Sequence, residues 1–531
     1  GVISFDSFYK TDDDAQNALN NLYQSFCLNI AGNEGIYVAL PLLFDEAGDD
    51  MLAAGNMYGD NDFGAQINEF RYDSQNEVIK NTYWGLYGVI YDCNLILDNI
   101  EPTTSIKKRV CAEARTLRAW SHMMLAIGWD CPPLVDHILK PSDKPANNAV
   151  EGGHNGLLEW CAKEAEAAVA DLDERESPSD KVGASKVTKG FALTVAGKAR
   201  LFKGDYAGAK ANLEQVITSK KYELVPTERW PNLFHASGDL CEEMIFQANA
   251  LENAAVGDWS NKIQRTSWMW IQFWNWRTDK LASKPSFIGP DGWGGHSIRA
   301  DFAERMLAND GNSPRRKATF LTGDEFLYEM EWNSTKGENL TRAELEKSPK
   351  IGIKDPTGLY GFAGYFANKF VAWPEDNEKG WYGFKNLTIF RYAEVLLMYA
   401  EACAQTSDPN GLGLKCLQDI QKRAGSAHLS TELTMQEVKN EKSYEMWLEA
   451  VRFPDMVRWG DTDGVVNNGK NIPTTYDAFF TKNEPIHRLY VETSNPNKGQ
   501  TGFVKGKHEY FAYPFAATSI NPNLKQNPSG E

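Results

Sequence analysis

Three carboxylates recur in this chain at a spacing that could support acid–base chemistry. Glu441, Glu445 and Glu449 follow one another at four-residue intervals, and Arg452 comes three residues later. Because an α-helix turns by about 100° per residue, it would hold all four side chains in one narrow stripe. Paired carboxylates beside a scissile bond are the catalytic groups of most glycosidases. Pro454 would end such a helix just before itself, or restart a short helix with proline in its first turn.

The same stripe also fits a structural role. Stacked carboxylates repel one another unless cations lie between them, so Arg452, together with Arg391 or Arg458, would pair with them. Arg391 belongs to a second charged helical pattern that precedes the first. There Arg391, Glu394 and Glu401 would share one face, opposite a side of alanines and leucines. We favour an ion-pair lattice between packed helices over catalysis, because nothing in the sequence indicates a cleft facing the carboxylates.

Helical periodicity dominates two parts of the chain, residues 78–220 and 387–460, which we interpret as one scaffold. The helical pairs expected in the first part are 78–100 with 106–127 and 156–172 with 187–203. Residues near its end match the tetratricopeptide spacing, in which small side chains let two helices approach closely. The match consists of Leu193, Gly197, Gly204, Tyr206, Ala209, Leu213 and Val216.

The rest of the chain, residues 221–386 and 461–531, has a different character. Residues 242–247 favour a short strand, and Gly, Pro, Asn and Trp then accumulate without a helical period. We therefore predict a mainly α-helical protein that forms a single unit over residues 1–531. Its helical-repeat scaffold would carry a loop-rich lobe and tail with a few short strands.

Composition argues against several classes of function. The 531-residue chain has 42% hydrophobic and 24% charged residues, as ordinary globular proteins do. Its formal net charge of −17 argues against nucleic acid or an anionic membrane surface as the main partner. No apolar run approaches the length of a membrane-spanning helix, and the first residues lack the basic and apolar regions of a signal peptide.

Motifs for metals and cofactors are absent as well. The eight cysteines show no zinc-type spacing, the histidines are scattered, and no nucleotide-binding, zinc-protease or nucleophile-elbow motif occurs. The acidic stretch 60–64 lacks the EF-hand pattern for calcium. We therefore expect no catalytic residue, no metal and no cofactor, and we favour free buried cysteines over disulfides.

Residues 389–460 resemble the C-terminal signature of the SusD/RagB family. Other segments similar to that family occur in its order along the chain, at residues 83–94, 113–119, 129–134 and 513–528. Two positions depart from the family pattern: Lys442, where arginine is usual, and Ala450, where glycine is usual. Both concern the packing of the scaffold and leave the functional resemblance intact.

The resemblance implies a SusD-like fold and a non-catalytic role. Members of this Bacteroidetes family are outer-membrane lipoproteins that bind oligosaccharide or polysaccharide and deliver it to a SusC-like TonB-dependent transporter. For this chain it implies a signal peptide and a lipidated cysteine upstream of the sequence, as the only attachment to the membrane. An α-helical glycoside hydrolase and a tetratricopeptide protein-interaction scaffold are the two alternatives.

A glycan presents apolar C–H faces and many hydroxyls, so its site combines aromatic rings with amide and carboxylate groups. The densest aromatic cluster spans residues 267–277, and its four tryptophans lie at even spacing. In a strand they would share one face, with alternate positions about 6.8 Å apart, as a platform for successive sugar rings. Gly- and Asn-rich loops at 55–62 and 291–296 would add further contacts. The ligand-binding candidates are Trp259, Trp268, Trp270, Trp274, Trp276, Trp293, Asn56 and Tyr58, with burial in the core as the alternative for each tryptophan.

Overall fold

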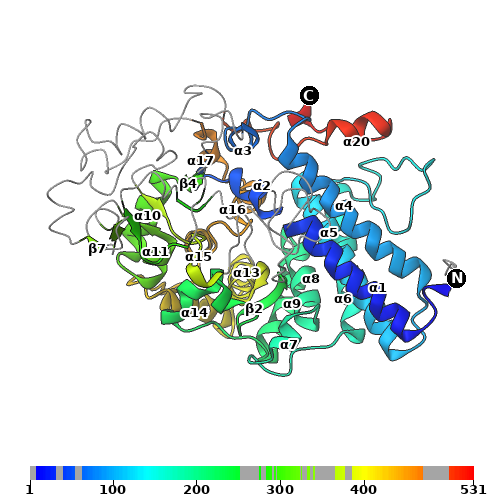
Figure 1. Cartoon of the computed structure of the whole chain (residues 1–531), viewed down its shortest axis with the longest axis horizontal. Helices are drawn as coiled ribbons and strands as arrows, with labels where there is room; N and C mark the ends of the chain where they lie inside the picture. Colours follow the sequence, from blue (N-terminus) through cyan, green and yellow to red (C-terminus); the bar gives the residue numbers. More distant parts are fainter. Residues whose placement is uncertain are drawn as a thin grey trace.

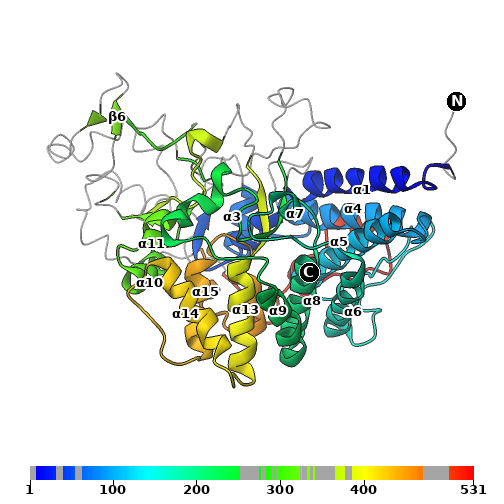
Figure 2. The ribbon, with the colours of Figure 1, turned by 90° about the horizontal axis from the view of Figure 1, so that it is seen from below.

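The computed structural model describes residues 7–31, 40–53, 62–250, 274–276, 283–289, 292, 294, 296–322, 325, 332–334, 339–340, 365–376, 385–469 and 502–531. These residues form a mainly α-helical fold with a few short strands, which confirms the predicted fold class (Figure 1). Helices from the first half of the chain lie side by side, and those of residues 392–459 continue beside them (Figure 2).

The first group contains α1 (Asp12–Phe26), α4 (Glu77–Asn99), α5 (Ser105–Trp129), α6 (Gly153–Ala168), α8 (Lys189–Lys203) and α9 (Tyr206–Ser219). Polar side chains fix where these helices begin. The side chain of Asn76 accepts hydrogen bonds from the first backbone N–H groups of α4, and Thr104 does the same for α5. The four helices α4, α5, α6 and α8 confirm the two predicted helical pairs to within a few residues.

Two glycines explain how α8 and α9 pack as the tetratricopeptide-like spacing predicts. A Cβ atom on Gly197 would lie 2.6 Å from Cδ2 of Leu213, so a larger residue would push the two helices apart. Gly204 ends α8 with a φ of 88°, a left-handed conformation that glycine adopts without strain. The carboxylate of Asp205 then caps α9. The close approach of the two helices therefore follows from the positions of these small residues.

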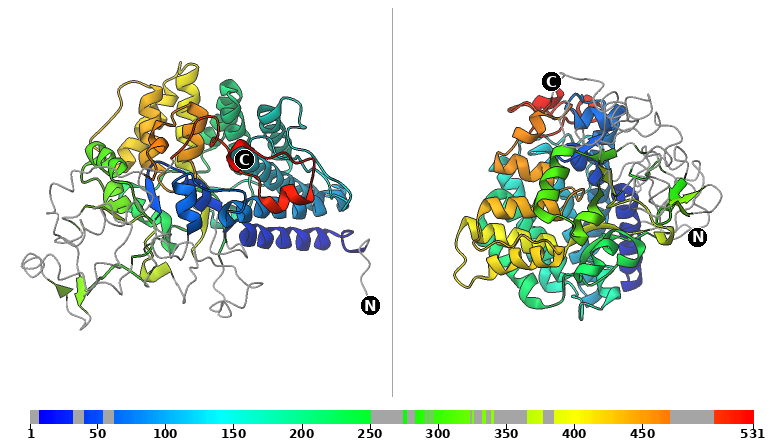
Figure 3. Two further views of the ribbon diagram at one scale, coloured as in Figure 1. Left: turned by 90° about the horizontal axis from the view of Figure 1, so that it is seen from above. Right: turned by 90° about the vertical axis from the view of Figure 1, so that its left-hand side faces the viewer.

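The second group contains α13 (Tyr392–Gln405), α14 (Leu412–Ala424), α15 (Met435–Glu445) and α16 (Arg452–Trp459). Because α13 packs against α9 as well as α14 and α15, the two groups form one continuous helical layer. The C-terminal residues 502–531 return to the first group (Figure 3). There the backbone N–H of Phe511 donates to the carbonyl of Gly128 at 2.8 Å, and the indole of Trp129 donates to that of Ala512 at 2.9 Å.

The strands form small antiparallel ladders. β2 (Met244–Ala248), which confirms the strand predicted at 242–247, pairs with β9 (Leu387–Arg391). β1 (Met51–Ala53) pairs with β4 (His296–Ile298), β5 (Phe320–Leu321) pairs with β8 (Phe366–Ala367), and β6 (Trp332–Ser334) lies between β3 (Ser283–Pro285) and β7 (Asn339–Leu340). The remaining short helices are α2 (Leu40–Glu46), α3 (Asp62–Asn68), α7 (Lys181–Ala184), α10 (Ala300–Asp310), α11 (Pro314–Thr319), α17 (Asp463–Val466) and α20 (Phe515–Ile520).

The helix predicted around Arg391 begins later than expected. Arg391 is the last residue of β9, and α13 starts only at the next residue. The predicted helical face shared by Arg391, Glu394 and Glu401 is therefore wrong. Pairing with β2 holds this stretch extended, and that long-range contact overrides its helical pattern.

The predicted helical stripe of carboxylates is also interrupted. α15 ends at Glu445, so Glu449 lies in the turn that follows and the predicted continuous helix is wrong. Leu448 and Ala450 adopt left-handed backbone conformations, with φ of 61° and 63°, and a right-handed helix cannot pass through them. The chain then restarts as α16 with Pro454 in its first turn, one of the two outcomes predicted for this proline.

Ala450→Gly is expected to raise the free energy of unfolding by about 1 kcal/mol. A left-handed alanine costs roughly 1–2 kcal/mol that glycine avoids, and the greater freedom of glycine in the unfolded chain offsets part of that gain. The backbone N–H of Ala450, which donates to Asp45 at 2.8 Å, is kept. Urea unfolding measures the change. Leu448→Gly serves as the control: it relieves the same kind of strain but removes a buried side chain, so it should destabilise the protein. Lowered stability of Ala450→Gly would contradict the assignment of strain.

In the part of the chain that the structure describes, no helix combines the length and apolarity needed to cross a bilayer. The same residues contain no group of three or more His, Cys, Asp and Glu side chains placed to hold a metal ion.

All eight cysteines are free thiols. Burial raises the pKa of Cys27 and Cys241 to about 11, so these two pack as small apolar side chains and not as reactive thiolates.

Candidate functional site

Glu441, Glu445 and Glu449, the carboxylates considered for acid–base catalysis, lie in a buried ion-pair network around Arg391. The guanidinium nitrogens of Arg391 lie 2.8 Å from Glu243, 2.7 Å from Glu445 and 2.6 Å from Glu449. Arg423 adds a contact of 3.0 Å to Glu445. The side chains of Arg391, Glu243 and Glu445 are fully buried. The predicted ion-pair lattice is therefore confirmed, with Arg391 at its centre.

Two of the arginines expected in this network pair elsewhere. Arg452 lies 2.9 Å from Asp49, and Arg458 lies 2.5 Å from Glu401. The prediction that they could neutralise the glutamate stripe is therefore wrong. Both arginines belong to α16, which the turn after α15 separates from that stripe.

Arg315, Arg423 and Lys369, which no sequence pattern singled out, supply further positive charge, and Lys369 lies 2.9 Å from Glu449. Arg315 lies 2.5 Å from Glu441 and 3.2 Å from Glu445. Burial alone would raise the pKa of Glu445, but the charges of Arg423, Arg391 and Arg315 hold that pKa well below its usual range. A carboxylate that stays ionised, accepts several hydrogen bonds and is closed to solvent cannot serve as a general acid for a substrate.

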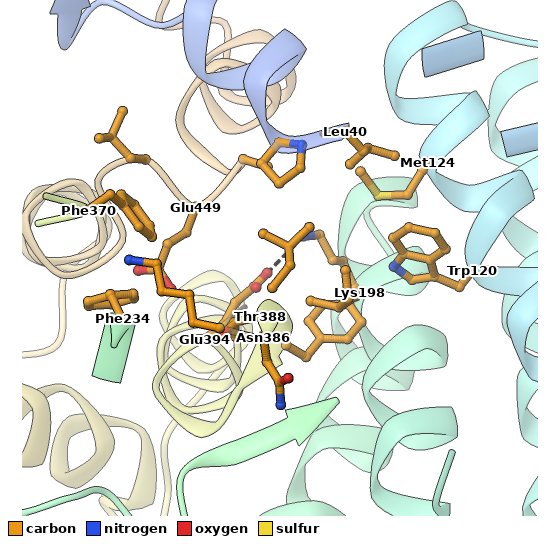
Figure 4. Close-up of a pocket in the computed structure, with 17 residues that line it drawn as sticks. Leu40, Trp120, Met124, Lys198, Phe234, Phe370, Asn386, Thr388, Glu394 and Glu449 are labelled. Carbon is orange, nitrogen blue, oxygen red and sulfur yellow. Dashed lines mark hydrogen bonds and ion pairs between the residues drawn. The ribbon is translucent and has the colours of Figure 1, made fainter. Parts of the chain in front are cut away.

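A small cavity adjoins this network, lined by residues of α2, α5, α8, β9 and α13 (Figure 4). Trp120, Lys198 and Glu394 are among its lining residues, and the last two form an ion pair of 2.8 Å. Its volume of about 50 Å³ admits a few water molecules. Pockets for small ligands measure roughly 300–1,000 Å³. The cavity is therefore too small to be the site of a sugar.

The two loops predicted to contact a ligand begin and end at the same place. β1 and β4 are antiparallel, and their register pairs Ala53 with His296. The chain therefore leaves β1 toward residues 54–61 at the point where it enters β4 from residues 290–295. The ladder brings together the ends of two segments that are far apart in the sequence.

The end of the tryptophan-rich segment is fastened beside them. The backbone N–H groups of Gly292 and Gly294 donate to the carbonyl oxygens of Trp276 and Asn275, both at 3.0 Å. A Cβ atom on Gly292 would lie 2.1 Å from Cβ of Asn275, so only glycine permits this approach. We call β1, β4 and residues 274–276 the loop anchor, because three candidate ligand-binding segments meet there.

His296 ties the loop anchor together. Its ring centroid lies 4.9 Å from that of Trp274, and its Nε2 lies 3.8 Å from Oε2 of Glu46. A Cβ atom on Gly64 would lie 2.1 Å from the same oxygen, so this glycine of α3 makes room for the carboxyl group. Burial raises the pKa of Glu46. The sequence gives no sign that Glu46 lies beside His296, because no local pattern relates residues so far apart in the chain.

Six of the eight ligand-binding candidates lie outside the described residues: Trp259, Trp268, Trp270, Trp293, Asn56 and Tyr58. The other two, Trp274 and Trp276, are only 2% and 1% exposed. The indole of Trp276 donates to the carbonyl of Ala367 at 2.9 Å. Residues 274–276 form a turn in place of the strand considered for them. Trp274 and Trp276 are therefore the buried part of the loop anchor and present no ring face to a ligand.

Comparison of the sequence with known protein families assigns the chain to a family. Residues 242–529, more than half of the chain, match the SusD family. The chain belongs to this family, whose members bind glycans without catalysing a reaction. It is 22% identical to SusD-like protein P25 of Formosa agariphila over 93% of this chain and 90% of that protein. It is also 22% identical to a SusD-like protein of Bacteroides ovatus over 74% of this chain and 68% of that protein.

Solved structures share the fold over nearly the whole chain. Surface glycan-binding protein A from Bacteroides fluxus aligns with a TM-score of 0.74 and 21% identity over 98% of this chain and 99% of that one. Surface glycan-binding protein A from Bacteroides thetaiotaomicron, in complex with laminarihexaose, aligns with a TM-score of 0.72 and 20% identity over 98% and 100%. A laminarin-binding SusD-like protein aligns with a TM-score of 0.71 and 21% identity over the same shares.

Proposed function

We propose that this protein captures oligosaccharide or polysaccharide at the outer-membrane surface and delivers it to a SusC-like TonB-dependent transporter. A lipid anchor upstream of residue 1 would hold it at the membrane. The observation that supports glycan capture is the loop anchor, where two Gly- and Asn-rich segments meet the tryptophan-rich one. The residues assigned to the ligand are Trp259, Trp268, Trp270, Trp293, Asn56 and Tyr58.

The ligand we propose is a neutral glycan. A net charge of −17 repels polyanions, so acidic polysaccharides such as pectins are disfavoured. Aromatic and amide side chains, which dominate the candidate segments, recognise uncharged sugar rings through stacking and hydrogen bonds. Laminarin is the first glycan to test, because one protein that shares this fold binds laminarin and another forms a complex with laminarihexaose.

Affinity gel electrophoresis tests this function directly. We expect laminarin or another neutral polysaccharide in the gel to retard the protein, and pectin to leave it unaffected. A protein of similar size without glycan affinity, run in the same gels, shows how much the polysaccharide slows migration by itself. The same incubations should release no reducing sugar, since the carboxylates of the Arg391 network are buried and paired with arginines.

Three results would count against the proposal. Release of reducing sugar would indicate a glycoside hydrolase. Migration unchanged by every polysaccharide of a neutral panel would remove glycan binding and favour the protein-interaction scaffold. Failure to co-purify with a TonB-dependent transporter encoded beside its gene would remove the delivery step while leaving glycan capture intact.

A further inference from the structure

A second concave surface lies on the helical part of the molecule and shares no lining residue with the loop anchor. It is a groove of about 290 Å³ between α4, the connection after α5, and the C-terminal segment that contains α20. This volume is close to the lower limit of small-ligand pockets, roughly 300–1,000 Å³. It is also several times larger than the cavity beside the ion-pair network.

An aromatic stripe forms the floor of the groove. Trp84, Tyr87 and Tyr91 all belong to α4 and all line the groove. Trp84 and Tyr91 are seven residues apart, so they lie on the same helical face about 10 Å apart along the axis. Trp84 is 40% exposed and Tyr91 is 53% exposed. Large aromatic side chains are mostly buried in folded proteins. Two exposed rings in one groove therefore form a candidate binding surface.

The walls of the groove are already held in place. The hydroxyl of Tyr87 donates to the carbonyl of Pro133 at 2.7 Å, which fixes the connection after α5 to α4. The side-chain amide of Asn521 donates to the carbonyl of Pro145 at 2.7 Å, which fixes the C-terminal segment to the same connection. A groove that is pre-formed in this way loses little conformational entropy when a ligand binds.

Polar groups surround the aromatic floor. His137, Asp143 and Lys144 are exposed and line the groove, so hydrogen-bond donors and acceptors lie beside the exposed rings. Aromatic rings beside such groups match the apolar faces and hydroxyls of a sugar chain. A stable protein interface buries about 800 Å² on each partner, which a groove of about 290 Å³ does not offer by itself.

We propose that this groove is a second, weaker glycan-binding site that holds another stretch of the polysaccharide bound at the loop anchor. This inference rests on the proposed function. A polysaccharide that occupies both sites gains affinity by avidity, whereas a short oligosaccharide occupies only the stronger one. The two sites together would therefore favour long chains over their short fragments.

The test compares a long and a short ligand on the full chain. Trp84→Ala/Tyr91→Ala is expected to weaken binding of laminarin about tenfold in affinity gels, because avidity is lost. Calorimetry with laminarihexaose should give an unchanged Kd. Both changes lie on an exposed helical face where alanine is a good helix former, so the melting temperature should stay the same. Val182→Ala, which shortens a side chain that is 74% exposed outside the groove, is the matched control and should change neither ligand's affinity.

The outcomes separate this inference from the function on which it rests. Unchanged laminarin affinity in Trp84→Ala/Tyr91→Ala, with the wild type binding normally, overturns the groove site alone. Equal weakening of laminarin and laminarihexaose also overturns it, since the variant would then act through the loop anchor. If the wild type is retarded by another neutral polysaccharide and not by laminarin, the same comparison is made with that polysaccharide and its hexasaccharide as the long and short ligands. A wild type that no polysaccharide retards overturns both proposals.

Discussion

Replacing Arg391 by alanine is expected to lower the free energy of unfolding by about 3–5 kcal/mol, or to prevent folding altogether. Arg391 contacts Glu243, Glu445 and Glu449 within 2.8 Å, and its own side chain is fully buried. Its removal leaves buried carboxylates without enough positive charge, and water cannot reach them to compensate. Urea or thermal unfolding, followed by circular dichroism, measures the loss.

Two further variants test whether the loss of stability comes from the buried guanidinium group of Arg391. Arg391→Lys keeps the charge but cannot make the same paired contacts, so it should be destabilised to a smaller extent. Arg229→Ala is the matched control, because Arg229 pairs with Glu242 at 2.6 Å while its side chain is 44% exposed. Exposed pairs contribute no more than about 1 kcal/mol. Equal effects of Arg391→Ala and Arg229→Ala would contradict a structural role for the network.

Replacing Trp268 and Trp270 together by alanine is expected to abolish retardation by polysaccharide in affinity gels. These residues belong to the segment that ends at the loop anchor, and we propose that their rings are the main stacking surface for sugar. Without them the groove on α4 is too weak to retain the polysaccharide by itself. The melting temperature should stay nearly unchanged, since removal of side chains that face a ligand costs little stability.

The same segment supplies the control for this second prediction. Trp274→Ala and Trp276→Ala should each destabilise the protein by about 3–5 kcal/mol, because both side chains are buried. The two pairs of variants thus separate binding from packing within ten residues of the chain. If melting collapses in Trp268→Ala/Trp270→Ala as well, those tryptophans belong to the core and the ligand site lies elsewhere.

The helical scaffold could be predicted from the sequence because its signals are local. Apolar residues at helical spacing mark α4 and α5, and the side chains of Asn76 and Thr104 cap them within the same few residues. The close packing of α8 against α9 follows from Gly197 and Gly204. The ordered segments similar to the SusD/RagB family are likewise readable along the chain, and the match over residues 242–529 supports the class of function they imply.

The helix boundaries that were predicted wrongly depend on contacts between distant segments of the chain. Arg391 has a helical pattern around it, yet pairing with β2 keeps it in a strand. Glu449 continues the spacing of Glu441 and Glu445, yet the left-handed backbone at Ala450 places it in a turn. In both cases a local preference of a few tenths of a kcal/mol per residue gives way to burial and ion pairing, which are larger.

By itself, then, the sequence determined the helical scaffold, the family and the kinds of side chain available to a glycan. The tertiary structure alone decided which of them meet. It pairs Ala53 with His296 and so joins two loops at one anchor. It also buries Trp276 against Ala367, although its spacing matches that of the proposed platform residues. The physical reason is that burial and pairing arise from contacts across long stretches of chain, which no periodicity within one segment encodes.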